Sequence, residues 1–147
     1  MGEVARCERC EIVEATTRFG WLLDRGKWVE LERVFSPQVE IDYTSLHGGE
    51  PYWGPARPKI DEWRGHWERA DAMQHLIANQ QVTRIAADFA FCTANCIATV
   101  ASTGPDGAGA VWSVGGTYRF ELIRETGSWL ISRVLMKVLW QTGSQPD

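Results

Sequence analysis

The sequence predicts an α+β fold: a cone-shaped barrel in which about three N-terminal helices pack on a curved mixed or antiparallel β-sheet and enclose a ligand cavity. Apolar residues follow helical spacing in stretches before residue 72 and then alternate with polar residues up to residue 140. Turn signals divide this second part into long strands. At 147 residues we expect one domain, residues 1–147, with flexible termini at about 1–9 and 142–147.

The N-terminal part contains three predicted helices. The first covers residues 5–25, and Gly26 supplies a left-handed cap after it. Residues 27–35 predict a second, short helix that ends at Ser36-Pro37. Helical spacing returns over residues 59–71 and predicts the third helix.

The strands are predicted from alternation and from turn residues. The stretch VEIDYTSL, residues 39–46, alternates and predicts a half-buried strand. Residues 47–58 contain three Gly and three Pro and predict a loop. The C-terminal part predicts a meander of strands at roughly 73–86, 89–103, 109–124 and 128–140.

The composition excludes several classes of partner. The formal net charge is −4 and no basic stripe is present, which argues against nucleic acid. No apolar run approaches the roughly 20 residues that span a bilayer, and the start MGEVARCERCEIVE is too charged for a signal peptide. We therefore expect a cytoplasmic protein that binds neither nucleic acid nor membrane. Eight tryptophans suggest a broad apolar interior, a ligand pocket or a partner surface.

Neither the cysteines nor the histidines form a metal-binding pattern. Cys7 and Cys10 make a CxxC motif, but Cys92 and Cys96 lie four apart in a strand-like run, about 13 Å from each other. A redox motif would need a βαβ context, which is missing, so we expect all four to be free structural cysteines. The three histidines show no HxH or HxxxH spacing, and no phosphate-binding loop occurs. We expect no metal and no organic cofactor.

The stretch DAMQHLIANQQV, residues 71–82, places a histidine among apolar neighbours. From periodicity alone, His75 is either a core histidine bonded to the backbone or a residue that faces a cavity. An imidazole titrates near neutral pH, with a reference pKa of about 6.5, and so suits proton transfer.

Three separated segments resemble a known family. FGWLLDRGKWVELERVFSPQVEIDYTS, MQHLIANQQV and GGTYRFELIRETGSWLISR, in this order, resemble the SnoaL-like, scytalone dehydratase-like branch of the nuclear transport factor 2 superfamily over residues 10–141. The resemblance implies that Asp24, Tyr43 and His75 point into the cone. The chain departs from scytalone dehydratase at Leu23, where that enzyme has a tyrosine, and in residues 97–103, which lack its second histidine.

The resemblance implies a cofactor-independent acid–base enzyme that acts on a small hydrophobic carbonyl compound, of polyketide, terpenoid or steroid type. His75 would be the general acid and base, Asp24 would orient its ring, and Tyr43 would polarise the carbonyl. The reaction would be a dehydration, a double-bond isomerisation or a cyclisation. The alternative is a non-catalytic ligand-binding protein or an assembly partner like a dioxygenase β-subunit. In either case we expect a homodimer or homotrimer.

Aromatic and polar residues are predicted to complete the pocket. The candidate substrate-binding residues are Trp53, Asn79, Trp112, Tyr118 and Trp140. Four other tryptophans are assigned to packing, namely Trp28, Trp63, Trp67 and Trp129. His47, in the Gly/Pro loop, is expected to be exposed or to cap the pocket, and His66 is expected to face solvent.

Overall fold

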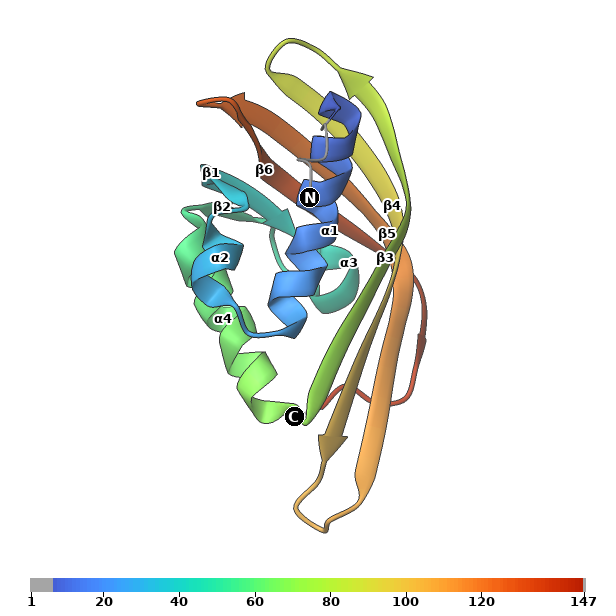
Figure 1. Cartoon of the computed structure of the whole chain (residues 1–147). Coiled ribbons are helices and arrows are strands. Elements are labelled where there is room, and N and C mark those ends of the chain that lie inside the picture. Colours follow the sequence, from blue (N-terminus) through green and yellow to red (C-terminus); the bar gives the residue numbers. More distant parts are fainter. Residues whose placement is uncertain (1–6, 147) are drawn as a thin grey trace, which may run out of the picture.

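The computed structural model describes residues 7–146 and confirms the α+β fold class. One six-stranded sheet curves around a layer of helices (Figure 1). The elements, in chain order, are α1 (Glu8–Asp24), α2 (Trp28–Glu32), β1 (Phe35–Asp42), α3 (Thr44–His47), β2 (Tyr52–Gly54), α4 (Ala56–Arg69), β3 (Ala72–Ile85), β4 (Phe89–Thr103), β5 (Gly109–Glu125) and β6 (Ser128–Thr142). The four long strands lie where alternation predicts them.

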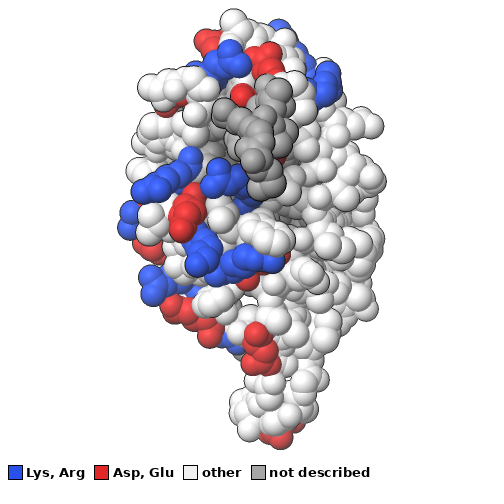
Figure 2. Space-filling model, viewed as in Figure 1, with Lys and Arg blue, Asp and Glu red and all other residues white. Residues whose placement is uncertain are grey.

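The sheet is mixed and open, with strand order β2-β1-β6-β5-β4-β3. Only the β1–β6 pair is parallel among these neighbours; the other pairs are antiparallel. Helix α1 crosses the concave side of the sheet and contacts β3, while α2 and α4 lie beside it (Figure 1). Charged side chains gather over this helical layer, and the side formed by the strands is largely uncharged (Figure 2).

Helix α1 begins and ends at recognisable caps. The Sγ atom of Cys7, at the N-cap, accepts a hydrogen bond from the backbone N–H of Cys10 at 3.1 Å. Gly26 has φ of +64°, the left-handed conformation predicted for it. The expectation of four free cysteines is wrong for the first pair, because Cys7 and Cys10 form a disulfide across the first helical turn. Cys92 and Cys96 are free and buried.

The segment between α2 and α4 differs from the prediction. Helix α2 ends at Glu32, and Phe35 already starts β1 because it pairs with Ile131 of β6. Pro37 is tolerated in this strand because the pairing register shifts between Phe35 and Glu40. Tertiary pairing therefore overrides the helical spacing of residues 27–35.

The first strand also ends earlier than predicted. A carboxylate oxygen of Asp42 accepts hydrogen bonds from the backbone N–H of Thr44 at 3.0 Å and from its hydroxyl at 2.7 Å. This local turn starts α3, so Tyr43 lies at the N-cap of a helix rather than inside a strand. The predicted loop at residues 47–58 contains β2 and the first turn of α4.

The core lies between α1 and the concave face of the sheet. Phe19 of α1 is fully buried, and its ring makes edge contacts with four aromatic rings. These rings belong to Phe35, Trp63, Tyr118 and Phe120, at centroid distances of 5.7 to 6.0 Å. Such edge-to-face contacts add to the stabilisation from area burial, and they fix α1 against β5 and α4.

The expected flexible termini fall partly on residues 1–6 and 147, which lie outside the described residues. Glu8 and Arg9 belong to α1, and Thr142 belongs to β6. In the part of the chain from residue 7 to residue 146, no helix is both long enough and apolar enough to cross a membrane.

Candidate functional site

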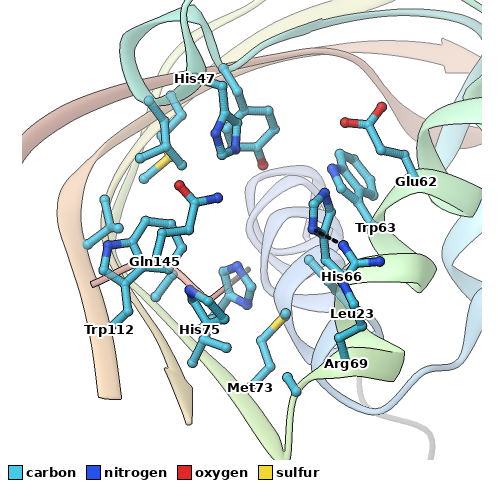
Figure 3. Close-up of a pocket in the computed structure, with 18 of the residues that line it drawn as sticks. Leu23, His47, Glu62, Trp63, His66, Arg69, Met73, His75, Trp112 and Gln145 are labelled. Carbon is cyan, nitrogen blue, oxygen red and sulfur yellow. Dashed lines mark hydrogen bonds between the residues drawn. The ribbon is translucent and has the colours of Figure 1, made fainter. Parts of the chain in front are cut away.

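A cavity of about 150 Å³ lies between α4, the beginning of β3 and the concave face of the sheet. Its inner wall is apolar and is formed by Leu23, Met73, Val100, Trp112, Val114 and Met136. Charged and polar side chains of α4 and of the segment around His47 surround the mouth (Figure 3). An apolar cavity of about 150 Å³ in another protein holds one benzene molecule, which sets the scale for a ligand.

His75 lines this cavity and is held by Asp24, the last residue of α1. One carboxylate oxygen of Asp24 lies 2.5 Å from Nδ1 of His75, and the other accepts the backbone N–H of His75 at 2.6 Å. The side chains of His75 and Asp24 are only 9% and 8% exposed. The carboxylate therefore fixes both the ring and the strand position of His75, and the ring is directed at the hollow (Figure 3).

The two hydrogen bonds of Asp24 leave the other ring nitrogen of His75, Nε2, available. Within residues 7–146, no hydrogen bond to Nε2 is found, and His75 is part of the cavity wall. A neutral imidazole that donates from Nδ1 presents an acceptor at Nε2. This arrangement can take a proton from a bound molecule while the carboxylate stabilises the imidazolium.

The close approach of α1 to β3 depends on a glycine. A Cβ atom at Gly20 would lie 2.9 Å from Cδ1 of Ile77 and 3.3 Å from Cβ of His75. A larger residue would require the Ile77 side chain to move and would crowd the strand that carries His75. Gly20 thus allows the helix end and the strand to meet at the Asp24–His75 pair.

Two tyrosines also line this cavity. The hydroxyls of Tyr43 and Tyr118 are 3.2 Å apart, and Tyr118 is 1% exposed. Burial raises the pKa of both phenols above the ordinary value of about 10. Both therefore keep their protons near neutral pH and can donate hydrogen bonds.

The mouth of the cavity carries two histidines, His47, which was expected to be exposed or to cap the pocket, and His66, which was expected to face solvent. His47 and His66 are exposed, yet both line the opening. Partial burial, together with the nearby His66 and Lys59, lowers the pKa of His47, and Glu62 opposes this effect. A usable signal existed, because Lys59, Glu62, His66 and Arg69 recur at helical spacing on one face of α4.

Of the predicted substrate-binding residues, Trp112 and Tyr118 line the cavity. Asn79 is not among the residues that line this cavity. The β3–β4 register shifts between Ala78 and Gln81, and Asn79 has a positive φ of 57°. This β-bulge reverses the alternation, so Asn79 lies on a different face from His75.

Trp53 and Trp140 also lie away from the cavity. Trp53 is 68% exposed on the short edge strand β2. Trp140 is 46% exposed. Its ring lies against Gly115, and a Cβ atom added at Gly115 would overlap the ring. The residue before Gly115, Val114, lines the cavity, so Gly115 and Trp140 belong to the opposite face of the sheet.

The described residues also bear on metal and thiol chemistry. Over residues 7–146, no group of three or more His, Cys, Asp or Glu side chains is placed to hold a metal ion. Cys96 is buried, and this burial raises the pKa of its thiol to about 11. A thiol of this kind is a weak nucleophile near neutral pH.

The fold and the site together define a helix-covered cone with an internal cavity, the nuclear transport factor 2-like fold. A model of the SnoaL-like domain matches residues 5–134, and the chain belongs to this family. A search of curated proteins gives no significant match.

Solved structures with this fold cover nearly the whole chain. The Kfla4162 protein of Kribbella flavida is 27% identical with a TM-score of 0.85, over 92% of this chain and 93% of that one. A candidate scytalone dehydratase of Novosphingobium aromaticivorans is 16% identical with a TM-score of 0.76, over 95% and 89%. A hexachlorocyclohexane dehydrochlorinase, LinA-type3, of Novosphingobium barchaimii is 17% identical with a TM-score of 0.73, over 92% and 89%. The last two likenesses show the fold alone.

Proposed function

We propose that this protein is a cofactor-independent acid–base enzyme, a lyase or an isomerase, that acts on a small hydrophobic carbonyl compound. The observation that carries the proposal is the buried Asp24–His75 pair beside an apolar cavity. A carboxylate that fixes an imidazole in this way is the arrangement by which enzymes orient a general base. The neighbouring structures named as a dehydratase and a dehydrochlorinase are compatible with elimination chemistry on this fold.

The first step would be proton abstraction from carbon. Nε2 of His75 takes a proton from the carbon α to the substrate carbonyl. The electron pair of that C–H bond forms a C=C bond, and the π pair of the carbonyl moves to its oxygen to give an enolate. Asp24 stabilises the imidazolium that forms. Tyr43 donates a hydrogen bond to the developing enolate oxygen, and Tyr118 can donate in turn to the hydroxyl of Tyr43 at 3.2 Å.

The second step determines the class of reaction. In a dehydration, the enolate re-forms the carbonyl and expels a β-hydroxyl group, which leaves as water with the proton from His75. A β-halide would leave without needing a proton. Return of the proton to another carbon of the conjugated system gives an isomerisation, and attack of the enolate on an internal electrophile gives a cyclisation.

The geometry favours an enzyme over the alternative of a non-catalytic ligand-binding or assembly protein. A binding protein needs an apolar cavity but has no need of a buried carboxylate directed at an imidazole. An acidic residue at a helix C-terminus is electrostatically unfavourable, and α1 nevertheless ends with Asp24. Such a local cost is more readily explained by a function in proton transfer.

Exchange of α-protons provides a test that needs no knowledge of the leaving group. Single-ring ketones are incubated with the protein in deuterated water, and loss of the α-proton signal is followed by NMR. We expect the wild type to accelerate exchange, and His75→Ala and Asp24→Asn to lower the rate by about 10²–10⁴-fold while the fold is retained.

The matched control is Asp61→Asn, which changes an exposed carboxylate on α4 outside the cavity and should keep the wild-type rate. Normal exchange by a folded His75→Ala variant would refute the assignment.

A further inference from the structure

The charges around the mouth of the cavity do not balance. Among its lining residues, the mouth has two permanent cations, Lys59 and Arg69, and one acid, Glu62. Nζ of Lys59 lies 2.8 Å from the carboxylate of Glu62, so these two charges form a pair. Arg69 is thereby left without an acidic partner among the residues that line the cavity, although Glu50 lies in the adjoining hollow.

Arg69 has a polar partner, but a neutral one. Its Nη2 atom lies 3.0 Å from Nδ1 of His66, and a guanidinium can only donate, so the imidazole nitrogen accepts. Over residues 7–146, Arg69 makes no ion pair with an acidic side chain. His66 therefore orients the guanidinium without neutralising it (Figure 3). Among residues 7–146, the other N–H groups of Arg69 make no hydrogen bond, and they can donate to an anion.

The cavity behind this mouth is small and apolar. Its volume of about 150 Å³ suits a single six-membered ring. A ring in contact with Trp112 and Val114 would have its substituent directed toward α4.

We propose that the cavity binds a small single-ring compound with one anionic arm, and that Arg69, oriented by His66, binds this arm at the mouth. The proposal rests on the proposed function in that it narrows the substrate of the same cavity. Arg69 is a specificity residue in this scheme, and it takes no part in proton transfer.

The test compares two probes of nearly equal shape, hydrocinnamate and its neutral methyl ketone analogue benzylacetone. Binding is measured by calorimetry near neutral pH and at low ionic strength. Because a charge-assisted pair is stronger than a neutral hydrogen bond, we expect the wild type to bind hydrocinnamate about tenfold or more tightly than benzylacetone. Added salt should reduce this preference.

Two arginine variants on α4 compare the loss of a charge at the cavity mouth with the loss of a charge elsewhere on the helix. Arg69→Gln should remove the preference for hydrocinnamate, with little change for benzylacetone. Arg64→Gln is the control, since Arg64 is bound to Glu68 at 2.8 Å and does not line the cavity. It should keep the wild-type preference.

Three results would overturn the proposal: equal affinity of the wild type for both probes, a preference that survives Arg69→Gln, or no binding of either probe at millimolar concentration. Its failure is distinguishable from failure of the proposed function. The probes need no turnover, so their binding can be measured whether or not the protein is an enzyme. If the protein prefers hydrocinnamate but shows no α-proton exchange that depends on His75, the result would support the anion site and contradict the proposed enzyme function.

Discussion

Asp24 is the residue on which the candidate site depends most. It occupies the unfavourable end of the α1 dipole, and its side chain is 8% exposed. Its carboxylate accepts two hydrogen bonds, from the ring and from the backbone of His75. Hydrogen bonds to charged groups contribute about 1.5–3 kcal/mol each, which offsets the cost of burial. The same contacts would fix a catalytic base.

The tyrosine pair predicts how stability depends on alkaline pH. Burial raises the pKa of Tyr43 and Tyr118 in the folded state, whereas an unfolded tyrosine ionises near pH 10. Above that pH the unfolded chain loses protons that the folded state retains, so the free energy of unfolding falls as pH rises. We expect thermal melting, followed by circular dichroism, to show full stability below about pH 10 and a progressive loss above it.

The control for this prediction is the double variant Tyr43→Phe/Tyr118→Phe, compared with its own stability near neutral pH. Because this variant lacks both phenols, it should lose less stability at alkaline pH than the wild type does. Equal losses in the two proteins would show that other groups cause the effect.

At the scale of elements, the contact between α1 and β3 positions the candidate pair. The prediction concerns Gly20→Ala, which adds a Cβ within 3.3 Å of Cβ of His75. Overpacking costs about 1–3 kcal/mol, while alanine gains about 1 kcal/mol in helix propensity. We expect a net loss of stability in urea unfolding, and slower α-proton exchange because α1 moves away from β3.

Gly65→Ala is the matched control for this prediction. Gly65 also lies within a helix, α4, and an added Cβ would meet only Nη1 of Arg69, at 3.8 Å. This variant should be stabilised by about 0.5–1 kcal/mol. If Gly20→Ala behaves in the same way and keeps full exchange activity, the packing argument is wrong.

Local pattern predicted the elements whose burial alternates regularly and missed those that depend on distant partners. The four long strands and α1 follow from periodicity because more buried and more exposed residues alternate along much of each strand, and the buried residues of α1 keep helical spacing. The strand at Phe35 depends on pairing with β6, nearly a hundred residues away. The bulge at Asn79 is a single extra residue, and period-two alternation cannot locate it.

For the molecule as a whole, the candidate site joins residues that no local pattern connects. Asp24, Tyr43 and His75 come from α1, the N-cap of α3 and β3. Resemblance to the SnoaL-like family indicated these three residues, whereas periodicity alone favoured a core position for His75. The position of the α4 residues at the cavity mouth could be assigned only from the structure. Helical spacing shows that they share a face of α4, but it does not show that this face borders a cavity.

The outer face of the sheet carries an apolar row that the fold leaves uncovered. Leu76, Ile97 and Trp140 are 56%, 40% and 46% exposed, and they lie across neighbouring strands. Leu76 pairs with Ile97, Ile97 with Gly115, and Gly115 with Trp140. Contiguous apolar patches of this kind are uncommon on monomers and mark interaction surfaces.

This row predicts self-association, in line with the homodimer or homotrimer expected from the sequence. Light scattering after size exclusion should give two or three times the chain mass of 16.6 kDa. Ile97→Lys places a charge at the centre of the row and should shift the protein toward monomer, because burying an unpaired ammonium is costly. Val29→Lys, at a 61% exposed position on α2, should leave the mass unchanged. A monomeric wild type, or an unchanged mass for a folded Ile97→Lys variant, would contradict this assignment of the outer face.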